Sequence, residues 1–93
     1  MVKIMTFYQD RSVKIRVISQ VGSCEAGHKA GDEFIASGKC PGNLCVWAFN
    51  TIFPYFQVLM CDGSFPWEKD PRKCTVACGD PENTVIFELS REK

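Results

Sequence analysis

The residues of this chain best suited to chemistry are six cysteines and a single histidine. The stretch CEAGHKAGDEF, residues 24–34, places Cys24 and His28 four positions apart in a glycine-bounded loop. A thiolate and an imidazole at this spacing can reach one ion, and tetrahedral zinc takes four such ligands. We expect Cys45 and Cys78 to complete the set around zinc or iron, an iron–sulfur centre included.

A second interpretation makes Cys45 the thiolate nucleophile of a small enzyme. This residue falls at the start of a predicted helix, where free backbone N–H groups and the helix dipole favour a negatively charged sulfur. His28 would serve as the acid–base group, in a pocket under Trp67 that accepts a small-molecule ligand. Asp32 and Asp80 are the carboxylates that we expect to orient the imidazole ring, whether as metal ligand or as base.

A third interpretation needs no chemistry, because a buried cysteine also serves as a small apolar side chain. Cys61 ends an apolar segment, and Cys74 shares one face of a predicted strand with Val76 and Cys78. With the cysteines as packing residues, the chain is a non-catalytic oligomeric subunit or a binding module.

Length and charge limit the class of protein. The chain has 93 residues, which we interpret as one domain over residues 1–93. Its 11 basic and 11 acidic residues cancel, so it lacks the positive field that binds nucleic acid or anionic lipid. No apolar run has the length of a membrane span and the start does not resemble an export signal, which predicts a cytoplasmic protein with reduced, redox-active or metal-binding thiols.

The elements that position these residues are predicted to be four strands and one helix. Residues 12–21 and 83–90 alternate apolar with polar side chains, while residues 33–37 and 73–79 are shorter strands between turn-rich loops. The first eleven residues are expected to form an edge strand or an arm. The pattern predicts an α+β fold, in which a small antiparallel sheet of about four strands is covered by one helix.

The predicted helix, residues 44–60, is apolar on nearly every side. Asn43 is placed to cap its start, and Pro54 is expected to kink or split it. Seven of the eleven aromatic residues of the chain fall between positions 47 and 67, more than a core of this size is expected to enclose. We therefore expect a homo-oligomer that associates through this helix.

The chain also resembles a family of small, uncharacterised bacterial and archaeal proteins of similar length. The resemblance covers residues 13–91 and rests on the loop C-x-x-G-H-K-x-G-D-x-F, the segments LCVWAF and FPWEKDP, and the C-terminal A-C-x-D-P-E-N-x-V-x-F-E. It implies a shared site, but it implies no particular reaction. The reactive positions that it marks are Cys24, His28, Asp32, Cys45, Cys78 and Asp80.

Overall fold

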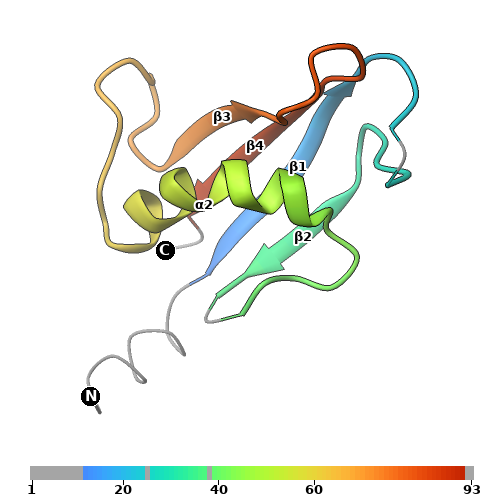
Figure 1. Cartoon of the computed structure of the whole chain (residues 1–93). Coiled ribbons are helices and arrows are strands. Elements are labelled where there is room, and N and C mark those ends of the chain that lie inside the picture. Colours follow the sequence, from blue (N-terminus) through green and yellow to red (C-terminus); the bar gives the residue numbers. More distant parts are fainter. Residues whose placement is uncertain (1–11, 25, 38, 92–93) are drawn as a thin grey trace.

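The computed structural model describes residues 12–24, 26–37 and 39–91, so the edge strand or arm predicted for the first eleven residues lies outside the described part. Within the described residues the chain forms two strands, one helix and two further strands, in that order (Figure 1). Their bounds are β1 Val13–Gln20, β2 Glu33–Ala36, α2 Val46–Met60, β3 Lys73–Ala77 and β4 Val85–Arg91. The α+β architecture expected from the sequence is confirmed.

The strands form one antiparallel sheet in the order β2-β1-β4-β3. The central strands β1 and β4 pair along most of their length, with Ile15 opposite Leu89 and Val17 opposite Phe87. The register between them shifts after Val17, at a bulge that comes shortly before the loop to β2. Such a bulge bends the strand locally and helps direct the chain into that loop.

The helix covers one face of this sheet and contacts β1, β3 and β4 (Figure 1). Every second residue of the central strands points into this layer, because strand side chains alternate between the two faces. In β4 the buried residues are Val85, Phe87 and Leu89, as the alternating pattern predicts. The helix contributes Ile52 and Leu59, which are fully buried.

The helix begins one residue after a cysteine and not after the asparagine expected to cap it. Cys45 is the N-cap, with φ −56° and ψ 131°, and its side chain makes no capping hydrogen bond. Asn43 has φ 68°, a left-handed conformation that forms the preceding turn and is incompatible with the extended geometry of an N-cap. The predicted cap at Asn43 is therefore wrong.

Pro54 lies inside α2, and the helix continues across it to Met60. A proline at this position removes the hydrogen bond to the carbonyl of Asn50, four residues earlier. Both residues face solvent, so water can bond to that carbonyl. The predicted split of the helix at Pro54 does not occur.

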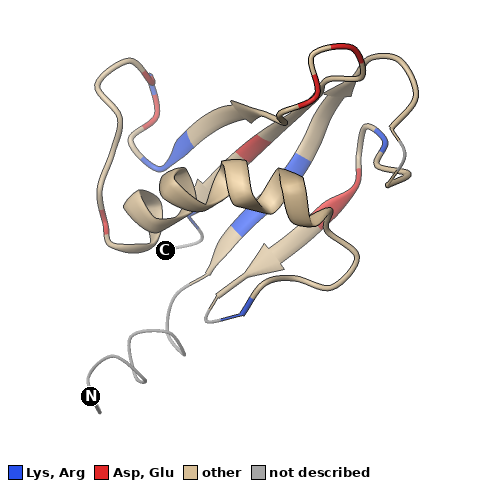
Figure 2. Cartoon of the chain, in the orientation of Figure 1, with Lys and Arg blue, Asp and Glu red and all other residues tan. Residues whose placement is uncertain are grey.

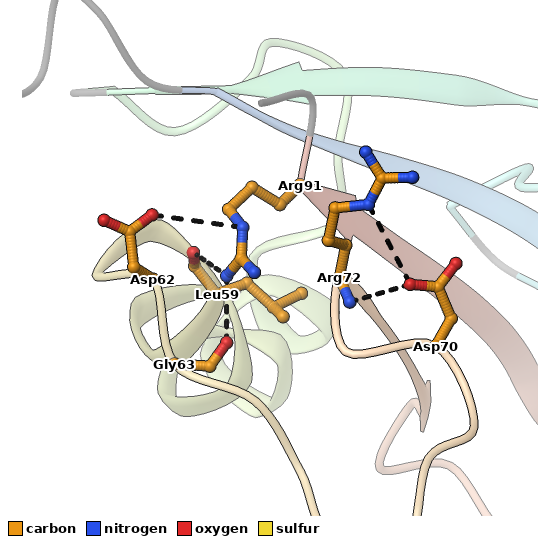
Figure 3. Close-up of polar contacts among 6 residues, drawn as sticks. All are labelled: Leu59, Asp62, Gly63, Asp70, Arg72 and Arg91. Atoms are coloured by element: carbon orange, nitrogen blue, oxygen red, sulfur yellow. Dashed lines mark hydrogen bonds and ion pairs between the residues drawn. The ribbon is translucent and has the colours of Figure 1, made fainter.

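The end of α2 is held by a cation from the last strand (Figure 3). The Arg91 guanidinium donates through Nη1 to the carbonyls of Leu59, at 2.8 Å, and Gly63, at 2.9 Å. Its Nε lies 4.0 Å from the carboxylate of Asp62. The last carbonyls of a helix lack partners within it, and Arg91 adds a second donor to the carbonyl of Leu59, which also accepts from the N–H of Asp62. The side chain thus ties the end of α2 to the sheet.

The loop between α2 and β3 is packed by two aromatic rings, Phe65 and Trp67, whose centroids are 5.1 Å apart. Glu68 in the same loop accepts a hydrogen bond from the backbone N–H of Thr75, 3.2 Å away, on the edge strand β3. The loop therefore occupies part of an otherwise open sheet edge.

Charged side chains lie on the sheet and in the loops, whereas α2 carries none (Figure 2). Within the described part of the chain, no helix has the length and hydropathy needed to cross a membrane.

Candidate functional site

A cavity of about 610 Å³ opens at the N-terminal end of α2. Its walls come from the β1–β2 loop, the first two turns of α2, the β3–β4 loop and the adjoining part of β4. The sequence separates these walls, and the fold brings them together because β1 and β4 are neighbours under the helix (Figure 1). Five of the residues singled out in the sequence line it: Cys24, His28, Cys45, Cys78 and Asp80.

His28 is the one polar residue in the buried set of the described chain, with 6% of its surface exposed. Its ring packs edge-on against Phe34, with centroids 5.4 Å apart, and against Phe87, at 6.1 Å. Gly27, with φ 80°, makes the turn that directs the histidine inward. Packing against Phe34 and Phe87 therefore fixes the position of the imidazole ring.

The ring nitrogen Nε2 of His28 accepts a hydrogen bond from the backbone N–H of Cys45, at 3.0 Å. An imidazole nitrogen that accepts carries no proton, so the neutral ring has its proton on Nδ1. The bond joins the β1–β2 loop to the residue at which α2 begins. It also occupies the lone pair that a metal ion would require at Nε2.

Cys78 follows the last residue of β3 and faces the same cavity. Its sulfur accepts a hydrogen bond from the N–H of Val85, at 3.2 Å, and lies 3.9 Å from the carbonyl oxygen of Asn83. Its backbone N–H pairs with the carbonyl of Val85 at 2.9 Å. Both the main chain and the sulfur of this cysteine are thus held against the start of β4.

The two carboxylates expected to orient the imidazole make other contacts. Asp32 accepts a hydrogen bond from the N–H of Lys29, at 3.1 Å, and so closes the turn before β2. Asp80 accepts from the N–H groups of Glu82, at 3.0 Å, and Asn83, at 3.2 Å. These backbone bonds, followed by one from the Asn83 amide, hold the pKa of Asp80 below its ordinary value.

The sequence reasoning missed Asn83, which joins the two loops that form the walls. Its Oδ1 accepts from the backbone N–H of Ser23, at 2.8 Å, and its Nδ2 donates to Asp80, at 3.3 Å. Gly22 sits directly against the amide with φ 74°, where a Cβ would overlap Asn83 Oδ1. We call the set Gly22, Ser23, Asp80 and Asn83 the clasp. Ser23 and Asn83 are 60 residues apart, so no local sequence pattern predicts their hydrogen bond.

The tryptophan beside the cavity is Trp47 and not Trp67. Trp47 lies in the first turn of α2 and is 79% exposed, whereas the Trp67 ring packs against Phe65 with 40° between the ring planes. Trp67 does not line this cavity, and the pocket expected under it stays a prediction. The position of Trp47, two residues after Cys45 at a helix start, is the signal that could have identified it.

The remaining cysteines lie away from the cavity. Cys40 and Cys61 are exposed, and Cys74 is buried in β3. Burial, assisted by the nearby negative charge of Glu68, raises the pKa of the Cys74 thiol to about 12. Cys74 is thus an inert packing residue, as the sequence led us to expect.

No group of three or more His, Cys, Asp or Glu side chains in the described ranges has an arrangement that could hold a metal ion. Cys24, Cys45 and Cys78 share a cavity, but their side chains would have to turn toward a common point to bind an ion. The comparisons add no relative to this geometry: family models, curated proteins and solved structures yield no match to the chain.

Proposed function

We propose that this protein carries out thiol–disulfide exchange with small molecules in the cavity at the start of α2. The observation that supports the proposal is that three cysteines, Cys24, Cys45 and Cys78, line one cavity beside a buried imidazole. Exchange needs an attacking thiol and gains from a second thiol that resolves the mixed disulfide, and this cavity offers both.

Cys45 is the attacking thiol in this proposal. As the N-cap it stands where the backbone N–H groups of the first turn are unpaired, and no acidic residue lies in that turn. Its sulfur makes no hydrogen bond to the described residues, whereas the Cys78 sulfur is engaged by Val85. The Cys45 sulfur is therefore free to react at the start of α2.

The reaction proceeds in two balanced steps. The Cys45 thiolate attacks one sulfur of a small disulfide, whose S–S bond breaks and whose other half leaves as a thiolate that takes up a proton. Cys24 or Cys78 then attacks the Cys45 sulfur, which releases the second half as a thiol and leaves a disulfide in the protein. The protein loses two electrons, and the small disulfide gains them.

His28 acts in this proposal by position. Its Nε2 holds the backbone of Cys45 at 3.0 Å, and its Nδ1 carries the proton of the neutral ring. The imidazole thus fixes where the helix begins and where the Cys45 side chain enters the cavity. No hydrogen bond joins the ring to the Cys45 sulfur, so the acid–base role weighed from the sequence receives no support from this geometry.

A second candidate function is the binding of zinc or iron by the cavity thiols. It is favoured by the soft ligands that share the space, since thiolates suit both ions. His28 would need to give up its bond to Cys45 before Nε2 could bind a metal. The candidate therefore rests on Cys24, Cys45 and Cys78 with side-chain rotation.

The test is to treat the reduced protein, its metal content measured beforehand by mass spectrometry, with glutathione disulfide and to locate the mixed disulfides. The proposal predicts a metal-free protein in which Cys45 is recovered as the glutathione adduct or in a disulfide with Cys24 or Cys78. Both products should be lost in Cys45→Ser and persist in the matched exposed variant Cys61→Ser. Adducts confined to Cys40 and Cys61 would refute it. Near-stoichiometric zinc or iron that protects Cys45 would replace it with the metal-binding candidate.

The proposal includes a reducing location such as the cytoplasm, because exchange starts from a reduced Cys45.

The proposal also states that the protein forms a homo-oligomer through α2. Val46 and Phe53 on this helix are 73% and 46% exposed, and α2 has no charged residue that would oppose contact with a second copy. Light scattering at micromolar concentration, with Phe53→Glu beside the unmodified chain, tests the association: a monomer in both samples would refute it.

A further inference from the structure

The rim of the cavity carries an aromatic surface that thiol exchange itself does not require. Trp47 lines the cavity two residues after Cys45, and 79% of its surface is exposed. Across the residues that the structure describes, its indole makes no ring contact. An indole held in a rigid helix at the mouth of a reactive pocket is a ready surface for a flat ligand group.

The other exposed tryptophan differs in this respect. Trp67 is 67% exposed, but its ring packs on Phe65 with centroids 5.1 Å apart, in a loop that does not line the cavity. The chain therefore contains one tryptophan with a packing role and one, Trp47, whose ring faces are available. The two form a matched pair for experiment.

The residues next to Trp47 leave room beside its ring. Ala48 has a small side chain, and the Thr51 hydroxyl donates to the backbone carbonyl of Trp47, 3.3 Å away. Across the cavity stands Gly79, where an added Cβ would come within 3.8 Å of Thr51 Oγ1. The β3–β4 loop thus approaches the helix closely at Thr51 without a side chain of its own.

We infer that the preferred reactants of this cavity are small disulfides that carry an aromatic ring, with Trp47 as the stacking surface and Cys45 as the attacking thiol. The inference rests on the proposed thiol exchange and names the substrate class for it. Trp47 and Cys45 line the same cavity, so a ring seated against Trp47 keeps its disulfide in the space that Cys45 borders. Stacking of this kind is worth about 0.5–1.5 kcal/mol, or roughly two- to twelvefold in rate if it is present in the transition state.

The experiment compares two uncharged reagents, 4,4′-dithiodipyridine and 2-hydroxyethyl disulfide, so that neither Asp80 nor the helix dipole favours one of them. The rate at Cys45 is measured by mass spectrometry and divided by the rate at Cys61, which is exposed and outside the cavity. This ratio removes the higher intrinsic reactivity of the aromatic reagent. We expect it to be about two- to twelvefold larger for the aromatic reagent than for the aliphatic one.

In Trp47→Leu the aromatic preference at Cys45 should fall to that at Cys61, and in Trp67→Leu it should persist. Both side chains are largely exposed, so both variants are expected to fold. An equal preference at Cys45 and Cys61 in the unmodified protein, or no change in Trp47→Leu, would overturn the inference while a fast Cys45 still supported thiol exchange. A Cys45 slower than Cys61 with both reagents would overturn the proposed function, and the inference with it.

Discussion

The clasp between the two loops predicts that Gly22→Ala is unusually costly for a change of one methyl group. Gly22 has φ 74°, and a non-glycine residue in this left-handed region costs about 1 kcal/mol or more. A Cβ there would also overlap Asn83 Oδ1 and lie 3.0 Å from the carbonyl of Glu82. The amide must move, which removes its hydrogen bond from Ser23 at a cost of about 1 kcal/mol.

The expected loss is therefore about 2–3 kcal/mol in the free energy of unfolding, measured by urea denaturation followed by circular dichroism. Gly27→Ala is the matched control. Its φ is 80°, close to that of Gly22, but a Cβ there meets nothing within 4 Å. It should cost only the conformational part, about 1 kcal/mol.

A double mutant separates the two contributions. In the background of Asn83→Ala the amide is gone, so Gly22→Ala should cost about as much as Gly27→Ala, and the coupling between positions 22 and 83 should be about 1 kcal/mol. If Gly22→Ala and Gly27→Ala destabilise equally, and the double mutant shows no coupling, the clasp does not hold the loops together.

Three further predictions follow from other contacts. Because the pKa of Cys74 is raised from 9.0 to about 12, the unfolded chain releases this proton first and stability falls as pH rises from 9.0 toward about 12. This decline is at most about 1.4 kcal/mol per pH unit, and denaturation of Cys74→Val should lack it; an identical slope in both proteins would contradict the burial of the thiol. Arg91→Ala should lower the free energy of unfolding by about 2 kcal/mol, because it loses the bonds to the carbonyls of Leu59 and Gly63. Arg72→Ala is the control: the ion pair of Arg72 with Asp70 is exposed and 3.9 Å long, so its loss should cost less than about 0.5 kcal/mol in the same assay. Long-range ¹H–¹⁵N spectra should show the neutral His28 ring protonated at Nδ1, and a proton at Nε2 would contradict its bond to Cys45.

Much of the fold could be predicted because it depends on local patterns. The alternation of Val85, Phe87 and Leu89 predicts a half-buried strand, and the structure buries all three in β4. The uncharged segment that became α2 was long enough to predict a helix. Its start could not be predicted from residue preferences, because Asn43 both caps helices and tolerates the left-handed turn that it forms here.

The candidate site could be predicted only in part. The reactive residue types identified Cys24, His28, Cys45 and Cys78, and the fold places all four around one cavity; their function stays a prediction. Their contacts depend on pairings across the fold, such as the bond from Cys45 to His28, 17 residues away. No rule of sequence spacing predicts a hydrogen bond between residues so far apart. The sequence therefore led us to expect a carboxylate, and not the backbone of Cys45, as the partner of the imidazole ring.

The central claim is that Cys45 is a reactive thiol held at the start of α2. The most direct test is a time course of iodoacetamide labelling of the reduced, metal-free protein near neutral pH, resolved for each cysteine by mass spectrometry. We predict that half-buried Cys45 is labelled faster than the exposed Cys40 and Cys61, and that Cys74 remains unlabelled until the chain unfolds. Labelling of Cys45 more slowly than Cys40 and Cys61 would show that exposure alone governs these thiols and would contradict the account.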